Sequence, residues 1–382
     1  MNMKKLVALL LALVMVFALC ACGPKDNQDT GKKDDGKKTA MKADDIPDEM
    51  TSSDGKYQVA FVTDVGDLKD KSFNQGTYDG VKLYANANSK SYKYYKPANG
   101  DKATDDDRYD AMKAAVDNGA EVVVAAGFLQ DAALEKAAKE FTDTKFVFID
   151  GSPVDGVTNL AAISFREEQC GYLAGYAAVM EGYTKLGFLG GMAVPAVIRY
   201  GYGYVQGADA AAQELGTNID INYFYGGQFY GDANITSRME GWYADGTQVV
   251  FACGGGIWTS ALDAAETHDG KVIGVDVDQR SKIGERCLTS AMKGLPSAIN
   301  NALDSYFSGN FSELGGTAQQ LGLKDGDYIG LPTDSESWGF TTFTQDQYET
   351  VLAGIRDGSI EISSDTENQP EVGSHVTVDY IS

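Results

Sequence analysis

Acidic, aromatic and glycine residues recur directly after the apolar segments of this sequence, where strands would end. The residues that share this position are Asp64, Asp70, Phe73, Asn74, Gly127, Asp150, Phe229, Gly254, Gly255 and Asp276. Carboxylates accept hydrogen bonds from hydroxyl and ring N–H groups, aromatic rings offer flat faces, and glycine lets the backbone approach a ligand. The set predicts a site for a neutral, flat, hydroxylated molecule, although each residue alone could serve as a turn former or helix cap.

Several kinds of chemistry lack the residues they need. The chain has two histidines, His268 and His375, and no HExxH or CxxC motif, so a zinc site or a histidine-based triad has almost none of the residues it needs. The glycines at 201, 203 and 207 miss the GxGxxG spacing by one residue, and GxxxxGK[ST] does not occur. We therefore expect no metal, no cofactor and no nucleotide ligand.

The composition describes a folded protein with an acidic surface. The chain has 382 residues, of which 43% are hydrophobic and 23% charged, which is enough apolar material for two ordinary domains. Against 55 Asp and Glu stand 32 Lys and Arg, giving a formal net charge of -23. Such a surface repels phosphate backbones, so no nucleic-acid partner is expected.

Short β-rich segments alternate with helical patterns, and this alternation occurs twice. The first set of strands is expected at 58–62, 92–95, 121–125 and 145–149, with helices near 74–88, 105–118 and 130–141. The second set is expected at 186–189, 222–225, 248–252 and 271–275, with helices near 198–215, 232–243 and 257–267. Continuous apolar strands between amphipathic helices predict parallel sheets covered on both faces.

The two halves align with each other. Residues 118–127 match 245–254 without a gap, and the next strands end in Ile149-Asp150 and Val275-Asp276. The fold class expected is therefore α/β, with two similar lobes whose strand ends face one cleft. A late segment, from Cys287 onward, must return across the hinge, so the chain crosses between the lobes more than once. We expect a monomer with a mainly N-terminal lobe at 57–175, a mainly C-terminal lobe at 176–290, and a hinge-crossing and closing segment at 291–382.

The N-terminus has the pattern of an export signal. Residues 1–22 contain Lys4 and Lys5, an apolar stretch of about 14 residues and small residues before Cys22. The stretch is shorter than the roughly 18 to 20 residues that span a bilayer, so a permanent membrane helix is the weaker interpretation. The sequence Leu19-Cys20-Ala21-Cys22 resembles a bacterial lipobox, which predicts lipidation of Cys22 and a lipid anchor outside the cytoplasm.

Residues 23–56, with few apolar residues and no periodicity, are expected to be a flexible tether. Three cysteines remain beyond it, at 170, 253 and 287, and an odd number cannot all pair. Buried free thiols are the expectation, and a bridge between Cys253 and Cys287 stays open.

Several motifs resemble the basic membrane protein family, the nucleoside-binding lipoproteins of ABC importers. The resemblance runs in order over about residues 57–310. The motifs that carry it stand at 62–66, 70–75, 127–128, 146–150, 164–168, 172–175, 190–191, 226–232, 274–279 and 290–293. It implies a two-lobed periplasmic-binding fold of the sugar-binding type, which closes by hinge motion on a purine nucleoside and delivers it to a permease.

The resemblance also implies roles for single residues. Phe73 and Phe229 resemble the pair that encloses the base, while Asp64, Asp70, Asn74 and Asp150 resemble its polar neighbours. Asp276 and Lys293 resemble the ribose contacts, with Gly254 and Gly255 close by. The ligands that these roles fit are inosine, guanosine and adenosine.

Two other functions remain as alternatives at this point. A sensor that presents its bound lobes to a membrane signalling partner would need the same closure. A metal-dependent nucleoside hydrolase is the weaker alternative, based on the spacing of Asp64, Asp67 and Asp70.

Overall fold

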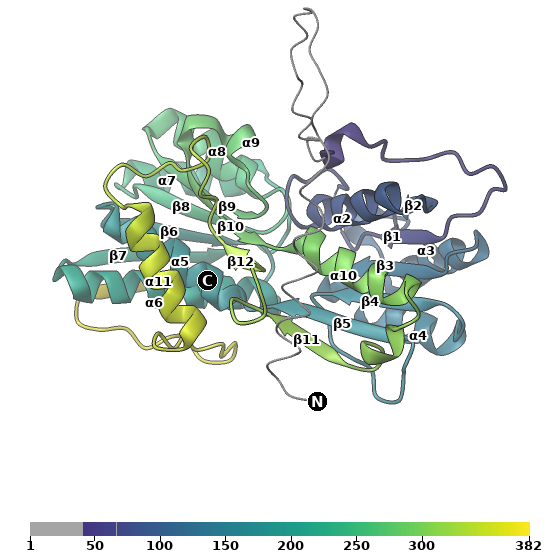
Figure 1. Cartoon of the computed structure of the whole chain (residues 1–382). Coiled ribbons are helices and arrows are strands. Elements are labelled where there is room, and N and C mark those ends of the chain that lie inside the picture. Colours follow the sequence, from purple (N-terminus) through teal and green to yellow (C-terminus); the bar gives the residue numbers. More distant parts are fainter. Residues whose placement is uncertain (1–40, 66) are drawn as a thin grey trace, which may run out of the picture. The chain divides into compact units, whose positions relative to one another are not determined.

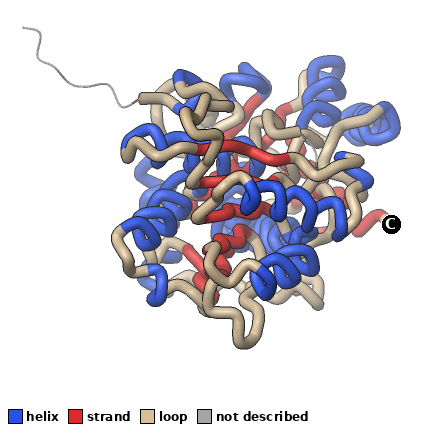
Figure 2. Tube along the Cα trace, turned by 90° about the vertical axis from the view of Figure 1, so that its right-hand side faces the viewer, coloured by secondary structure: helices blue, strands red, loops and turns tan. Residues whose placement is uncertain are grey.

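The computed structural model describes residues 41–65 and 67–382, which contain two separate β-sheets (Figure 1). The strands lie inside a shell of helices (Figure 2), and most strand residues are buried on both faces. This burial explains why the strands read as continuous apolar segments rather than as alternating ones. Among the described residues, no helix has the length and apolar character needed to cross a bilayer.

The first sheet is entirely parallel and has the order β11-β5-β4-β3-β1-β2. One face is covered by α2 and α10 and the other by α3 and α4. Its strands are β1 (Val59–Val62), β2 (Tyr92–Tyr95), β3 (Val122–Ala126), β4 (Lys145–Ile149), β5 (Leu160–Phe165) and β11 (Ala318–Leu321). Its helices are α2 (Phe73–Ala87), α3 (Asp105–Asp117), α4 (Asp131–Glu140) and α10 (Leu295–Phe307).

The second sheet has the order β12-β10-β9-β8-β6-β7-β13, in which only the pair β10 and β12 is antiparallel. Its strands are β6 (Lys185–Gly190), β7 (Ile219–Tyr225), β8 (Val249–Cys253), β9 (Lys271–Asp276), β10 (Cys287–Lys293), β12 (Ile329–Gly330) and β13 (Val376–Ile381). The accompanying helices are α5 (Glu167–Met180), α6 (Pro195–Leu215), α7 (Ala233–Ala244), α8 (Trp258–His268), α9 (Arg280–Ile283) and α11 (Gln345–Asp357). Five single-turn 3-10 helices complete the described elements: η1 (Ala43–Asp45), η2 (Gly100–Lys102), η3 (Phe128–Gln130), η4 (Gly284–Arg286) and η5 (Phe311–Glu313).

The chain passes between the two sheets three times. It leaves the first sheet after β5, returns after β10 to form α10 and β11, and crosses again before β12. Helix α5 packs against α6 and β10, so the expected lobe boundary at residue 175 falls inside an element of the second lobe. All the predicted strands and helices are present. The strands and helices not predicted from the sequence are β5, β10, β11, β12, β13, α5, α9, α10 and α11.

Four glycines bring α5 and α6 unusually close together. A Cβ atom at Gly171 or Gly175 would lie 2.1 Å from a carbonyl oxygen of α6. One at Gly203 or Gly207 would lie 2.1 or 2.0 Å from a carbonyl oxygen of α5. Any larger residue at these positions would therefore force the helix backbones apart. Helix packing thus explains Gly203 and Gly207, whereas a Cβ atom at Gly201 would lie 2.1 Å from the Tyr223 hydroxyl oxygen.

The segment before β1 packs onto the first lobe. Ile46 is buried, and Tyr92 donates its hydroxyl hydrogen bond to the Pro47 carbonyl. The ammonium of Lys82 lies 3.1 Å from a carboxylate oxygen of Asp48. The tether expected at 23–56 therefore does not extend over this part of the chain. The export signal, Cys22 and residues 23–40 lie outside the described residues.

The three described cysteines, Cys170, Cys253 and Cys287, are buried free thiols. The open question of a bridge between Cys253 and Cys287 is thereby answered: none forms. Burial in apolar surroundings raises the pKa of the Cys287 thiol to about 11, so it stays protonated at neutral pH.

Candidate ligand-binding site

One pocket lies between the two lobes and is lined by the carboxyl ends of strands from both sheets. The space inside it, counted together with the solvent at its open side, is about 710 Å³. All eleven residues singled out in the sequence line it: Asp64, Asp70, Phe73, Asn74, Gly127, Asp150, Phe229, Gly254, Gly255, Asp276 and Lys293. Residues far apart in the chain are brought together because parallel strands end at the same edge of each sheet.

Asp64 follows β1 and lies against Gly127, which follows β3. Asp64 Oδ1 accepts a 2.6 Å hydrogen bond from the Val65 amide. A Cβ atom at Gly127 would stand 1.8 Å from Asp64 Oδ2, and Gly127 has a φ of +100°. Only glycine fits there. Burial raises the pKa of Asp64 to about 7, so near neutral pH this carboxyl group can donate as well as accept a hydrogen bond.

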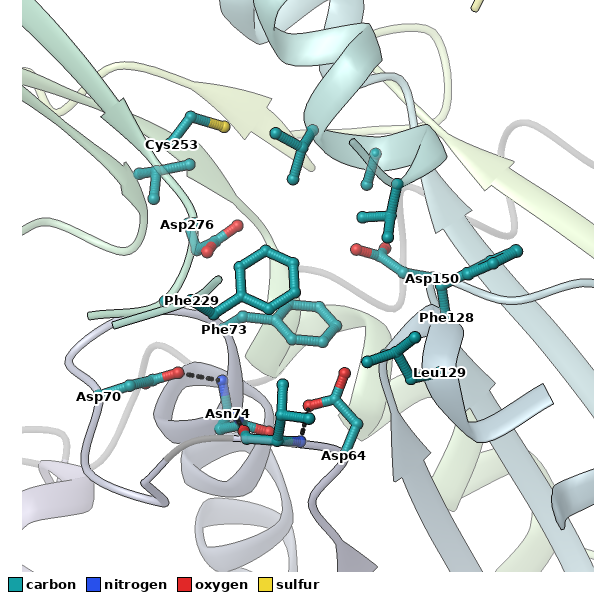
Figure 3. Close-up of a pocket in the computed structure, with 18 of the residues that line it drawn as sticks. Asp64, Asp70, Phe73, Asn74, Phe128, Leu129, Asp150, Phe229, Cys253 and Asp276 are labelled. Atoms are coloured by element: carbon teal, nitrogen blue, oxygen red, sulfur yellow. Dashed lines mark hydrogen bonds between the residues drawn. The ribbon is translucent and has the colours of Figure 1, made fainter. Parts of the chain in front are cut away.

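Asp70 lines the pocket and also caps the helix that follows it. Its two carboxylate oxygens accept hydrogen bonds from the amides of Ser72, Asn74 and Gln75, at 2.8 to 3.1 Å. These amides belong to the start of α2, where helix N–H groups otherwise lack partners. The side chain of Asp70 thus fixes the first turn of α2, which carries Phe73 and Asn74 at the pocket (Figure 3).

Phe73 and Phe229 project into the middle of the pocket from different lobes (Figure 3). Phe73 begins α2, and Phe229 lies in the loop between β7 and α7. A Cβ atom at Gly191 would come within 2.4 Å of Phe229 Cδ1, and one at Gly254 within 2.9 Å. Gly255, with a φ of +50°, would place its Cβ 2.6 Å from the Phe229 carbonyl oxygen. These glycines therefore make room for Phe229, rather than only for a ligand.

Asp150 and Asp276 occupy equivalent places in the two lobes, at the ends of β4 and β9. Both have left-handed backbones, with φ of 59° and 65°. This conformation is uncommon outside glycine, although aspartate tolerates it better than most residues, and it concentrates at functional sites. Because of it, both carboxylates turn toward the pocket (Figure 3).

Lys293, the last residue of β10, holds these two carboxylates together. Its ammonium is hydrogen-bonded to Asp150 Oδ2 and lies 3.9 Å from Asp276 Oδ1. Burial raises the pKa of Asp150 to about 6 while the attraction of Lys293 opposes that rise. Burial lowers the pKa of Lys293, but its acidic neighbours outweigh burial and raise it. The same ammonium lies 5.0 Å from the ring centre of Phe73, within cation–π range.

Three hydrogen bonds join the loop before α2 to the second lobe. Trp258 Nε1 donates to the Asp70 carbonyl at 3.2 Å, and Gln279 Nε2 donates to the Lys71 carbonyl at 2.8 Å. Ser72 Oγ donates to Asp276 Oδ2 at 2.6 Å. The described conformation is therefore one in which the lobes are bridged across the pocket.

Nine further pocket residues were not singled out, and most are apolar. They are Val65, Phe128, Leu129, Val194, Ala196, Val197, Tyr200, Cys253 and Val275. Four of them adjoin predicted strand ends, so their position alone could have placed them among the predicted site residues: Phe128, Leu129, Cys253 and Val275. Four others lie at or just before the start of α6, and nothing in their side-chain chemistry indicates a site: Val194, which precedes the helix, and Ala196, Val197 and Tyr200 within it.

The hydrolase alternative required Asp67 to lie in the pocket with Asp64, but Asp67 is not among the described residues that line it. Its side chain is 87% exposed and pairs with Lys96 at 3.1 Å. Within residues 41–65 and 67–382, no group of three or more His, Cys, Asp or Glu side chains is arranged to hold a metal ion.

Comparison with known proteins identifies relatives along nearly the whole chain. Residues 57–364 match the family model Bmp, described as ABC transporter substrate-binding protein PnrA-like. The "ABC transporter nucleoside-binding protein BmpA" of Lactococcus lactis subsp. cremoris is 28% identical over 376 residues, covering 93% of this chain and 97% of the relative. Basic membrane protein D of Borreliella burgdorferi is 30% identical over 292 residues, covering 74% and 81%.

Solved structures share the fold at lower identity. An ABC transporter solute-binding protein from Aeropyrum pernix has a TM-score of 0.66 at 22% identity, covering 80% of this chain and 87% of that one. The arabinose-binding component of an ABC transporter from Shewanella has a TM-score of 0.54 at 16% identity, covering 79% and 97%. The predicted two-lobed fold of the sugar-binding type is confirmed. The family consists of binding proteins rather than enzymes, and the chain belongs to it: it is a Bmp-family substrate-binding protein of an ABC transporter.

Proposed function

We propose that the protein is a lipid-anchored, extracytoplasmic receptor of an ABC importer, which acts as a monomer, binds a purine nucleoside between its lobes and delivers it to the permease. The observation that carries this proposal is the pairing of Phe73 and Phe229, one from each lobe, beside the cluster of Asp150, Asp276 and Lys293. An aromatic pair suits a flat base, and a carboxylate beside an ammonium suits a diol.

The remaining polar groups fit the edge of a base. Asn74 is buried and its Oδ1 has no hydrogen-bond partner, so it is available to an amino or ring N–H group. Asp64, with a pKa raised to about 7, is able to accept or donate. Four aspartates line the pocket beside one ammonium, and this balance disfavours a phosphate, which supports a nucleoside over a nucleotide. The printed name of the Lactococcus relative, a nucleoside-binding protein, agrees with this ligand class.

Isothermal calorimetry of the protein without its first 22 residues tests the ligand. Inosine, guanosine and adenosine are titrated alongside cytidine, hypoxanthine and ribose. We expect the purine nucleosides to bind most tightly, because only they occupy both the aromatic and the carboxylate ends of the pocket. Equal affinity for ribose alone, or no heat with any nucleoside, would contradict the proposal.

The anchor is tested separately in the native host. Replacing Cys22, which lies outside the described residues, by Ser should move the protein from the membrane fraction to the soluble extracytoplasmic fraction. A variant that stays with the membrane would show that an uncleaved N-terminal helix holds the protein instead.

A further inference from the structure

Lys293 is the one positively charged residue among those described as lining the pocket, and three acidic groups surround it. Its side chain is 1% exposed. Two of its acidic neighbours, Asp150 and Asp276, line the pocket themselves. The third, Glu167, lies 3.0 Å from the ammonium but does not line the pocket.

Glu167 is the first residue of α5, and its side chain is completely buried. Its Oε2 accepts a 2.5 Å hydrogen bond from Nε of Arg199, which lies on α6 and is 13% exposed. Oε1 is the atom nearest Lys293. Arg199 and Lys293 thus contact the two oxygens of one carboxylate, and the close packing of α5 against α6 places Arg199 beside Glu167.

This arrangement restrains the position of the Lys293 ammonium. An ammonium group has three N–H donors on a flexible four-carbon stem. The ammonium is hydrogen-bonded to Asp150 and lies 3.0 Å from Glu167 Oε1 as an ion pair, whereas Asp276 Oδ1, on the pocket lining, is farther away at 3.9 Å. Without Glu167, Asp150 would be the one described acidic neighbour left in close contact with the ammonium, because Asp276 is 3.9 Å away.

The charges of the network also require Arg199. Three buried carboxylates surround one ammonium, and a buried charge without a partner is costly. Arg199 compensates the negative charge of Glu167, so that Lys293 remains available to interact with Asp150, Asp276 and a ligand. Loss of Glu167 would leave the buried Arg199 guanidinium without its carboxylate partner. Loss of Arg199 would leave Glu167 with Lys293 as its one close cation among the residues that the structure describes.

We propose that Glu167, held by Arg199, is a positioning residue for ligand binding, which fixes the Lys293 ammonium so that one N–H faces the sugar end of the pocket. The proposal rests on the proposed function, because the ligand is taken to be a nucleoside. Glu167 itself does not touch the ligand. Its effect should therefore appear in affinity for molecules that carry a sugar, and not in affinity for the base alone.

The test uses Glu167→Gln, which keeps the size of the side chain and removes its charge, with Glu168→Gln as the matched control. Glu168 is the next residue of α5 and equally buried, but its partner is Arg166 at 3.5 Å and it does not contact Lys293. By calorimetry, Glu167→Gln should weaken inosine binding about 10-fold or more, leaving hypoxanthine within about 2-fold. Glu168→Gln should leave both unchanged.

A double-mutant cycle separates positioning from general destabilisation. If Glu167 acts through Lys293, then Glu167→Gln should cost little further affinity in a Lys293→Met background. Arg199→Lys should retain more inosine affinity than Arg199→Met, because it keeps the charge. Additive losses in the cycle would overturn the proposal.

A measurement without ligand makes the outcome independent of the nucleoside assignment. A rigid, water-shielded ammonium gives an observable ¹H–¹⁵N cross-peak in NMR, which Lys293→Met identifies by its absence. The peak should persist in Glu168→Gln and disappear or broaden in Glu167→Gln. If no nucleoside binds but the peak behaves in this way, the proposed function fails and the positioning role stands. An unchanged peak in Glu167→Gln overturns the positioning role.

Discussion

Ser72 and Asp276, which are 204 residues apart in the chain, are joined by a 2.6 Å hydrogen bond from Ser72 Oγ to Asp276 Oδ2. Ser72 precedes α2 in the first lobe, whereas Asp276 ends β9 in the second. The bond occupies one oxygen of the carboxylate proposed to bind ribose hydroxyls. Closure of the lobes and binding of the sugar therefore use the same side chain.

Replacing Ser72 by Ala should weaken nucleoside binding by about 10- to 150-fold, since hydrogen bonds to charged groups are worth about 1.5 to 3 kcal/mol. The loss arises because only the bridged conformation contains this bond. Calorimetry measures the affinity, and thermal unfolding of the empty protein serves as the control. A lower melting temperature with unchanged affinity would show that the bond stabilises the fold and not the closed state.

Phe73→Ala and Phe229→Ala should each weaken purine nucleoside binding by about 5- to 150-fold, because stacking of a base on an aromatic ring is worth about 1 to 3 kcal/mol. Tyr230→Ala is the matched control, since Tyr230 adjoins Phe229 but is 43% exposed and outside the pocket lining. Equal effects of all three changes on affinity would contradict the assignment of the rings.

Trp258→Phe should reduce nucleoside affinity by about 2- to 13-fold through loss of its hydrogen bond to the Asp70 carbonyl. The loss should be seen mainly as faster dissociation in stopped-flow measurements, because the bond bridges the lobes. Trp242→Phe provides the comparison: Trp242 is buried within the second lobe, so its replacement should lower stability and leave affinity unchanged.

Asp64 should make the stability of the empty protein depend on pH between about 4 and 7. Its pKa is about 3.9 when unfolded and about 7 when folded, so the folded state holds a proton that the unfolded state has lost. Stability therefore falls as pH rises through this window, by up to about 4 kcal/mol, and levels off above it.

Urea denaturation of the wild type and of Asp64→Asn from pH 4.5 to 8 measures this contribution. The free energy of unfolding of Asp64→Asn should rise relative to that of the wild type as the pH is raised to about 7. Asp67→Asn changes an exposed position, so its free energy of unfolding should differ from that of the wild type by the same amount at every pH. Parallel curves for all three proteins would show that Asp64 is not perturbed.

Gly203→Ala should destabilise the fold by about 1 to 3 kcal/mol, because the new methyl group would stand 2.1 Å from the Glu168 carbonyl oxygen. Gly241→Ala is the control within another helix, α7, where no atom lies within 4 Å of the added Cβ. It should stabilise the protein by about 0.5 to 1 kcal/mol, since alanine is the better helix former. Chemical denaturation of both variants decides between close packing and helix propensity.

The sequence by itself determined the two parallel sheets and the strand ends that line the pocket. Two local patterns carried this information: the hydrophobic periodicity and the match of residues 118–127 to 245–254. Both depend only on residues that are close together in the chain, so they can be recognised in the sequence. The position of Asp150 and Asp276 followed from them, because parallel strands bring their carboxyl ends to one edge.

Only the tertiary structure decided what each polar group is paired with. Asp70 and Asp64 look alike in the sequence, yet the first fixes the start of α2 and the second faces the pocket beside Gly127. Glu167 carries no sequence signal that distinguishes it from Glu168, although only Glu167 reaches Lys293, 126 residues away. Such pairings depend on long-range packing of α5 against α6 and on the three passages between the sheets, which no local pattern encodes.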